Sequence, residues 1–229
     1  MLMYGWMKWV EIAPQRYDWA VTVMTFGRLD HIKERIANEV RAGDHVLDIG
    51  CGTGTLAVRC LRKSAYVTGI DSSKYMIEQT QRHASEAGLA DRLVVVQDSV
   101  TQLRKHFGDG SFDLIVSTMV LGEFPREYLS YVMRDCRALL RPGGRLIIAD
   151  EVLPDRLLTR IFYAIGLGLL WIPNFLLLRR PLFPIADLPG VIRAGGFQIK
   201  SIESWAASSF KMVSAESPIL DAATPGMVP

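Results

Sequence analysis

The chain has 229 residues, of which 49% are hydrophobic and 22% are charged. This composition excludes a largely disordered protein and supplies enough apolar side chains for one domain with a substantial core. The 26 Lys and Arg residues nearly balance the 24 Asp and Glu residues, which argues against a dedicated nucleic-acid-binding protein. The three cysteines and four histidines lack the spacing of a disulfide framework or a metal site, so we expect a reducing, cytoplasmic location and no bound metal.

Residues 1–43 are predicted to form an N-terminal helical cap. Apolar residues recur at helical spacing before Pro14, and further helices are expected over residues 15–26 and 29–40. Lys8 and Glu11 interrupt the first apolar run, which is therefore a poor secretory signal.

From residue 44 onward, short apolar runs alternate with helical patterns. Strands are predicted over residues 45–49, 65–70, 93–96, 112–117, 145–149, 197–203 and 209–213. Helices are predicted over residues 55–61, 74–87, 125–140 and 188–194. Continuous apolar strands between helices are typical of an α/β fold whose mostly parallel sheet is covered on both faces. Functional groups should then lie at the carboxyl ends of the strands.

The pattern divides the chain into three parts. Residues 44–213 form the predicted domain, and a hydrophobic insertion over residues 152–185 follows its fifth strand. The last part, residues 214–229, is rich in Ala, Ser and Pro and is expected to be a flexible tail.

A glycine-rich loop joins the first predicted strand to the helix after it, in the sequence V-L-D-I-G-C-G-T-G from Val46 to Gly54. Such a loop lets a ligand approach backbone amides at a helix N-terminus, although a plain tight turn is the alternative. Its spacing is G-x-G-x-G, whereas dinucleotide-binding loops usually have G-x-G-x-x-G. Asp48 would repel a pyrophosphate but attract an ammonium or sulfonium group. The electrostatics therefore favour S-adenosylmethionine over a dinucleotide.

Two further acids follow the second and third predicted strands. Asp71 can accept hydrogen bonds from both hydroxyls of a ribose, a role that also fits NAD, or it can stabilise the start of the next helix. Asp98 can accept a hydrogen bond from an adenine amine, or it is an ordinary surface acid.

Five motifs in order resemble those of class I S-adenosylmethionine-dependent methyltransferases. They are the glycine loop, G-I-D-S-S at 69–73, V-V-Q-D-S at 95–99, F-D-L-I-V-S at 112–117 and L-R-P-G-G-R-L-I-I-A-D at 140–150. The chain is most similar to the ubiquinone/menaquinone methyltransferase type, in which Arg16-Tyr17-Asp18 would close over the cofactor. The start of the chain also resembles corrinoid-protein-associated methyltransferases. The resemblance implies a Rossmann-like sheet with a final antiparallel strand.

The same resemblance implies a set of cofactor residues. The glycine loop with Asp48 would hold the methionine end, Asp71 the ribose, and the other members the adenine and the methyl donor. The full set is Tyr17, Asp48, Gly50, Cys51, Gly52, Thr53, Gly54, Asp71, Ser72, Met76, Asp98, Ser99 and Ser117.

Methyl transfer from a sulfonium depends mainly on positioning, and a base is needed only when the acceptor must lose a proton. Glu123 and Glu151 follow the fourth and fifth strands and are the candidate catalytic residues. Each could equally be a helix cap or a solvated acid.

Residues 161–178 form an uncharged apolar run that reaches the lower length limit of a membrane-spanning helix. Pro173 lies inside it, and two strands of the domain follow it, so we expect a hydrophobic lid over the acceptor site rather than a span. A buried core helix is the alternative. Trp171 and the flanking arginines also suit contact with a membrane interface. The protein could then be peripherally bound to the inner face of the membrane.

The sequence therefore predicts a methyltransferase acting on a hydrophobic small molecule or a lipid-like acceptor. The alternatives are a methyltransferase that works with a corrinoid protein and a non-catalytic subunit that binds S-adenosylmethionine. Candidate partners are the acceptor, a membrane surface, a corrinoid protein and a second copy of the chain, but not nucleic acid.

Overall fold

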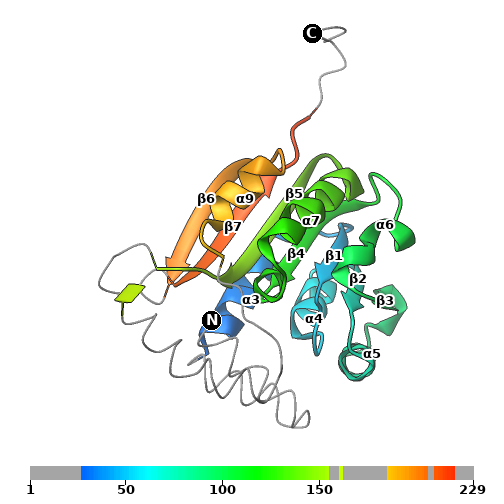
Figure 1. The fold of residues 1–229 in the computed structure, drawn as a ribbon. Coiled ribbons are helices and arrows are strands. Elements are labelled where there is room, and N and C mark those ends of the chain that lie inside the picture. The colour runs from blue at the N-terminus through cyan, green and yellow to red at the C-terminus, as the bar shows by residue number, and fades with distance from the viewer. Residues whose placement is uncertain (1–26, 155–159, 162–184, 206–208, 220–229) are drawn as a thin grey trace, which may run out of the picture.

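The computed structural model describes residues 27–154, 160–161, 185–205 and 209–219. Seven strands form one open sheet in the order β3-β2-β1-β4-β5-β7-β6 (Figure 1). Strands β1 to β5 pair in parallel, and β7 runs antiparallel to both β5 and β6. The strands are β1 His45–Ile49, β2 Tyr66–Asp71, β3 Leu93–Gln97, β4 Phe112–Thr118, β5 Leu140–Glu151, β6 Gln198–Trp205 and β7 Phe210–Glu216.

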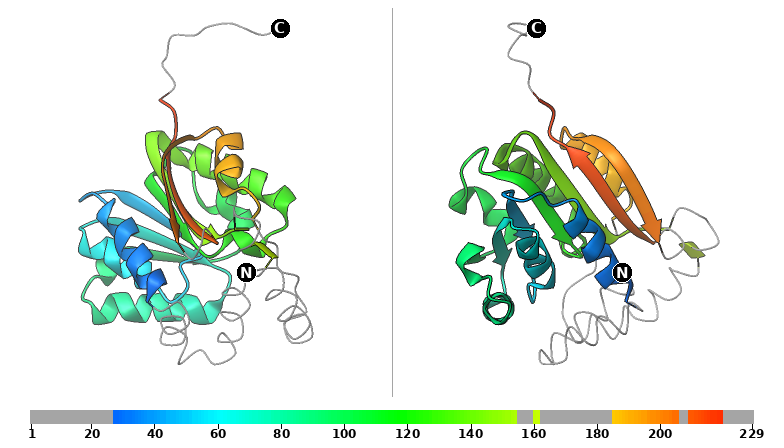
Figure 2. Two further views of the ribbon diagram at one scale, coloured as in Figure 1. Left: turned by 90° about the vertical axis from the view of Figure 1, so that its left-hand side faces the viewer. Right: turned by 180° about the vertical axis from the view of Figure 1, so that it is seen from behind.

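Helices cover both faces of the sheet (Figure 2). One face carries α3 (Arg28–Asn38), α4 (Thr55–Arg62) and α5 (Lys74–Glu86). The other carries α6 (Leu103–His106), α7 (Arg126–Leu139) and α9 (Leu188–Ala194). Each face has its own buried apolar cluster, so the sheet is a layer between two cores, as the continuous apolar strands predict.

The predicted α/β sheet with a final antiparallel strand is confirmed, but several strand boundaries differ, most of all those of β5 and β7. Strand β5 begins at Leu140, because the Pro-Gly-Gly turn continues the strand through a register shift instead of only ending the preceding helix. Strand β7 continues to Glu216, so residues 214–216 belong to the sheet and not to a tail. Backbone hydrogen bonds join Ser217 to Gly143 and Gly144, which extends this pairing by one more residue.

Several predicted parts lie outside the described residues. These are the first two helices of the cap, nearly all of the 152–185 insertion and the end of the predicted tail. The third predicted helix is α3, whose Leu29, Ile32 and Ile36 are buried against the sheet and α4. Within the described ranges, no helix is both long and apolar enough to cross a membrane.

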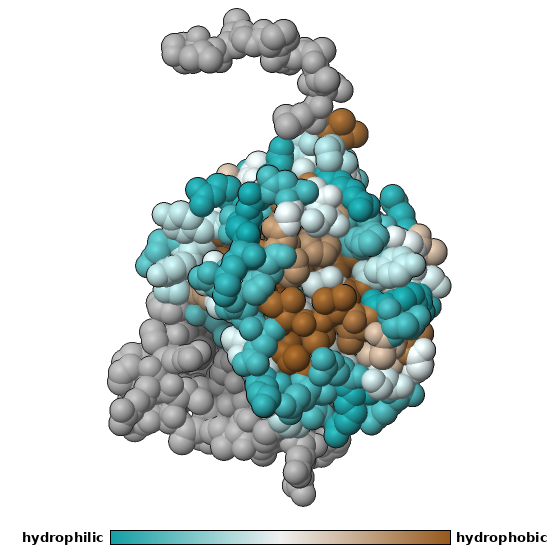
Figure 3. All heavy atoms as spheres, turned by 90° about the vertical axis from the view of Figure 1, so that its right-hand side faces the viewer, coloured by the Kyte–Doolittle hydropathy of each residue, from teal (hydrophilic) through white to brown (hydrophobic). Residues whose placement is uncertain are grey.

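Strand β3 forms one edge of the sheet, and apolar surface gathers on this side of the molecule (Figure 3). Val94 is 59% exposed and Tyr66 on the adjacent strand is 49% exposed. Helix α6 next to them has a single turn. The sheet is therefore less covered here than at its centre.

Candidate cofactor site

The glycine loop leaves the carboxyl end of β1 and leads into α4. Gly50, Gly52 and Gly54 have φ angles of +67°, +56° and +81°, which favour glycine. A Cβ atom at Gly50 would overlap the side chain of Val120, and one at Gly54 would lie 2.8 Å from Thr80. The turn favours glycine at all three positions, and close neighbours require it at Gly50 and Gly54.

Asp71 joins this loop to the start of α5. One carboxylate oxygen accepts a hydrogen bond from the Gly52 N–H at 3.0 Å, and the other accepts one from the Ser73 N–H at 2.8 Å. Ser73 caps α5 through its hydroxyl, which accepts from the Met76 N–H. The carboxylate therefore shapes the loop as well as facing the cleft beside it.

A cleft at the carboxyl ends of the strands brings six of the predicted residues together. It is lined by Gly50, Asp71, Ser72, Asp98, Ser99 and Glu123, with Ile70, Val100, Val120 and Phe124 as its apolar members. The predicted convergence of functional groups at this edge of the sheet is what the structure shows.

The Asp98 carboxylate at this cleft accepts three hydrogen bonds from neighbouring residues. It accepts hydrogen bonds from His106 at 2.7 Å, from Lys105 at 3.1 Å and from the Ser99 N–H at 2.8 Å. The hydrogen bond from His106, followed by those from Ser99 and Lys105, lowers the pKa of Asp98 well below its usual range. Asp98 is thus a fixed anion at the cleft rim.

Asp48 is the buried acid of the site. Its side chain is 1% exposed, and among the described residues neither carboxylate oxygen has a hydrogen-bond partner. The pKa of Asp48 is raised to about 7, mainly by burial; the Lys33 ammonium opposes this shift and the Asp71 carboxylate adds to it. Lys33 itself donates a hydrogen bond to the Thr55 hydroxyl at 2.5 Å. A buried carboxylate without partners is costly, and a ligand that brings a positively charged N–H donor would remove that cost.

Cys51 supports the loop and is not a nucleophile. Its sulfur is buried 3.7 Å from the Thr80 hydroxyl, which in turn donates to the Gly52 carbonyl at 2.8 Å. Burial and the nearby acids Asp48 and Asp71 raise the pKa of the Cys51 thiol well above its usual range. All three cysteines are buried and free.

The remaining predicted residues are placed differently. Thr53 and Met76 are buried, and the Thr53 carbonyl lies 2.8 Å from His83 Nδ1. Ser117 is buried with no partner for its hydroxyl among the described residues, and its pairing with Ile49 places it on the opposite face of the sheet from Asp48. Tyr17 lies outside the described residues.

The two candidate catalytic acids occupy different positions. Glu123 ends the 3-10 helix η4 (Leu121–Glu123) and lines the cleft. Glu151 ends β5, is 5% exposed and pairs with Phe210 of β7. Glu151 is therefore a buried strand-end acid outside the cleft lining, whereas Glu123 shares the cleft with Asp71.

Asp150 is a functional candidate that the sequence analysis missed. One of its carboxylate oxygens accepts from the N–H groups of Val120, Leu121 and Gly122 at 3.1, 2.8 and 3.4 Å. The other accepts from the Glu151 N–H at 2.8 Å. Burial raises the pKa of Asp150 to about 7 despite these bonds. The signal in the sequence was available, because Asp150 is the next-to-last residue of its strand, as Asp48 is, and Asp71 ends β2.

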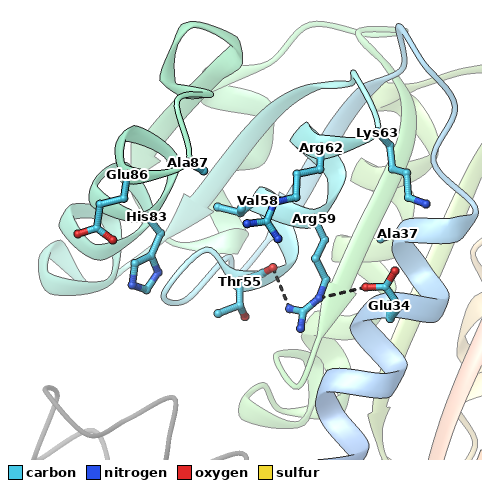
Figure 4. Close-up of a pocket in the computed structure, with 10 residues that line it drawn as sticks. All are labelled: Glu34, Ala37, Thr55, Val58, Arg59, Arg62, Lys63, His83, Glu86 and Ala87. Atoms are coloured by element: carbon cyan, nitrogen blue, oxygen red, sulfur yellow. Dashed lines mark hydrogen bonds and ion pairs between the residues drawn. The ribbon is translucent and has the colours of Figure 1, made fainter.

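A second groove of about 790 Å³ lies on the outside of α3, α4 and α5 (Figure 4). Its Arg59 donates to the Thr55 carbonyl at 3.0 Å and pairs with Asp30 and Glu34. None of the predicted cofactor residues lines it, so it is not part of the cofactor site. Among the described residues, no cluster of His, Cys, Asp or Glu could hold a metal ion.

Comparison with known proteins decides which family these features represent. Residues 46–144 match the family model described as a methyltransferase domain. This match and the open seven-stranded sheet support a class I S-adenosylmethionine-dependent methyltransferase domain. S-adenosylmethionine is therefore the implied cofactor, and the unpartnered Asp48 fits its ammonium group.

Two curated relatives are similar over this domain. The 27-O-demethylrifamycin SV methyltransferase of Amycolatopsis mediterranei is 36% identical over 115 residues, which cover 50% of this chain and 41% of that protein. The ubiquinone biosynthesis O-methyltransferase of Nitrosococcus oceani is 36% identical over 122 residues, covering 53% of this chain and 48% of that protein. The chain thus spans about half the length of the curated relatives it matches. The predicted similarity to ubiquinone methyltransferases is confirmed over this shared part.

Solved structures share the fold at low identity. The [4+2]-cyclase SpnF has a TM-score of 0.66 and 20% identity, with 83% of this chain and 82% of that chain covered. An S-adenosylmethionine-dependent methyltransferase from Mesorhizobium loti has a TM-score of 0.63 and 20% identity, with 80% and 95% covered. Since one of these proteins is named as a cyclase, the fold alone does not fix the reaction.

Proposed function

We propose that this protein transfers the methyl group of S-adenosylmethionine to an oxygen atom of a hydrophobic small molecule. The observation that carries the proposal is the buried Asp48 carboxylate, which lacks partners beside a loop shaped by three glycines. A dinucleotide would bring negative charge to this position, whereas S-adenosylmethionine brings an ammonium group.

The chain's own residues would divide the binding of the cofactor. Asp48 would accept hydrogen bonds from the ammonium group, and Asp71 would accept them from the ribose while keeping the loop closed around it. Asp98 and Ser99, which line the cleft, would contact the adenine. When bound, S-adenosylmethionine supplies an electrophilic methyl group and leaves as a neutral thioether.

An oxygen acceptor must lose its proton during or after attack on the methyl carbon. Glu123 lines the cleft and is the better placed of the two candidate bases. Glu151 is buried at the end of β5. A role for it in proton transfer would require the acceptor to enter from the β5 side.

The names of the curated relatives support an oxygen acceptor on a quinone or polyketide skeleton. The apolar run at 161–178 supports a hydrophobic acceptor, although nearly all of it lies outside the described residues. Partnership with a corrinoid protein, with a membrane surface or with a second copy stays a prediction. The cyclase neighbour gives a second candidate, a reaction in the same fold without methyl transfer.

The test combines cofactor binding with product detection. Purified protein is titrated with S-adenosylmethionine, S-adenosylhomocysteine and NAD, and is then incubated with S-adenosylmethionine and phenolic quinone precursors or hydroxylated macrolides. We expect binding of the first two ligands and a mass increase of one methylene in an acceptor, matched by S-adenosylhomocysteine formation. Binding of NAD without binding of either sulfur ligand would overturn the proposal. Conversion of an acceptor without a mass change would favour the second candidate.

A further inference from the structure

One wall of the cleft is a short segment that follows β4. Val120, Glu123 and Phe124 of this segment line the cleft together with Gly50 of the glycine loop. Its regular structure is limited to the three-residue helix η4. Because so short a helix is not stable by itself, contacts with the rest of the domain must fix its position.

The segment begins with an unusual backbone turn. Met119 has a φ angle of +61°, which is uncommon for a residue other than glycine, and its N–H donates to the Ala149 carbonyl at 2.9 Å. After this turn the next three N–H groups point to one place, where they meet a single Asp150 oxygen. Successive N–H groups arranged in this way form a concave site for an anion.

A carboxylate suits this position better than an amide does. The second Asp150 oxygen accepts from the Glu151 N–H, so both oxygens act as acceptors. Asparagine offers one acceptor oxygen and would place its NH₂ group against one of these N–H donors. The buried charge is thus matched to four backbone donors from two neighbouring segments.

The held segment packs directly against the glycine loop. Val120 packs so closely on Gly50 that a Cβ atom there would overlap it. Glu123 moves with the segment, because its N–H donates to the Val120 carbonyl at 3.0 Å. The placement of the cleft wall and of the candidate base therefore depends on the same anchor.

We propose that Asp150 is a positioning residue for the cofactor site. Its carboxylate holds Val120–Gly122 so that the wall meets the glycine loop at the spacing that the cofactor requires. This inference rests on the proposed function, since it takes S-adenosylmethionine as the ligand of the cleft.

The test compares Asp150→Ala and Asp150→Asn with matched substitutions of Asp44. Like Asp150, Asp44 is a buried acid that accepts a hydrogen bond from a backbone N–H, that of Arg41. Unlike Asp150, it lies before β1, at the opposite end of the sheet, and pairs with Arg145. Affinity for S-adenosylhomocysteine is measured by calorimetry on the full chain, well below each variant's melting temperature. Hydrogen exchange at the amides of residues 120–122 reports whether the segment is held.

We expect Asp150→Ala to weaken S-adenosylhomocysteine binding at least tenfold and to speed exchange at residues 120–122. Asp150→Asn should recover part of both losses, and it also serves if the alanine variant does not fold. The Asp44 variants should lose thermal stability but keep the affinity within about twofold.

Equal affinity losses in the Asp44 and Asp150 series would overturn the positioning role, because a general loss of stability would then explain both. Wild-type affinity in Asp150→Ala together with fast exchange at 120–122 would overturn it as well. If the wild-type protein binds neither sulfur ligand, the proposed function fails, an outcome distinct from either of these.

Discussion

Replacing Asp48 by Asn should stabilise the ligand-free protein while removing cofactor binding. Burial raises the pKa of Asp48 from 3.8 to about 7. The folded state therefore binds a proton that the unfolded state releases over this interval, and stability falls as the pH rises. A shift of roughly 3 units corresponds to about 4 kcal/mol of stability, which the wild type loses at about 1.4 kcal/mol per pH unit as the pH rises. Asparagine removes the charge without changing the volume.

The free energies of unfolding of the two proteins should thus converge near pH 4 and separate above it. From about pH 7 upward, Asp48→Asn should be more stable than the wild type by about 2–4 kcal/mol, since its amide also lacks partners. Subtracting the two proteins' pH profiles isolates Asp48, because Asp150 and every other group titrate in both. The assay is urea denaturation from pH 4.5 to 8.5.

Adding S-adenosylhomocysteine should remove the stability advantage of Asp48→Asn. A ligand at about 1,000 times its dissociation constant adds about 4.1 kcal/mol to the protein that binds it, and we expect the wild type to gain more than the variant. Parallel pH profiles of the two ligand-free proteins would refute the reasoning, since they would show that Asp48 does not carry the buried charge.

Three further changes test the loop, the ribose site and the end of the domain. Asp71→Ala should weaken S-adenosylmethionine binding by about 1.5–3 kcal/mol, measured by calorimetry, because it removes an acceptor for charge-assisted hydrogen bonds. Gly50→Ala should abolish this binding and lower the melting temperature more than Gly88→Ala, which has the same backbone strain at φ +68° but no atom near the added Cβ; equal effects of the two would contradict the proposed clash. Truncation after residue 213 should lower the melting temperature because it removes the last residues of β7, whereas truncation after residue 219 should leave it unchanged.

The sheet and the glycine loop could be predicted because their patterns are local. Continuous apolar runs identify the parallel strands, and G-x-G-x-G places the turn after β1. The extension of β7 to Glu216 could not be predicted in this way. It depends on pairing with β5 across the sheet, and residues 214–216 have no apolar alternation strong enough to indicate a strand.

The candidate site was predictable where an acid lies at or next to the end of a strand, as Asp71 and Asp48 do. Its internal hydrogen bonds were not predictable. Asp98 accepts a hydrogen bond from His106, whose position depends on the fold of α6, and Asp150 accepts from backbone groups about 30 residues earlier. Both contacts depend on tertiary structure that a single sequence does not show.

The most direct test of the central claim is a calorimetric titration of the wild type and Asp48→Asn with S-adenosylhomocysteine at pH 8. The ammonium group of this ligand should pair with the Asp48 carboxylate, so we expect binding by the wild type and a loss of at least tenfold in affinity in the variant, with both proteins folded. Equal affinity of the two proteins would contradict the account, because the buried carboxylate would then not be the group that recognises the cofactor.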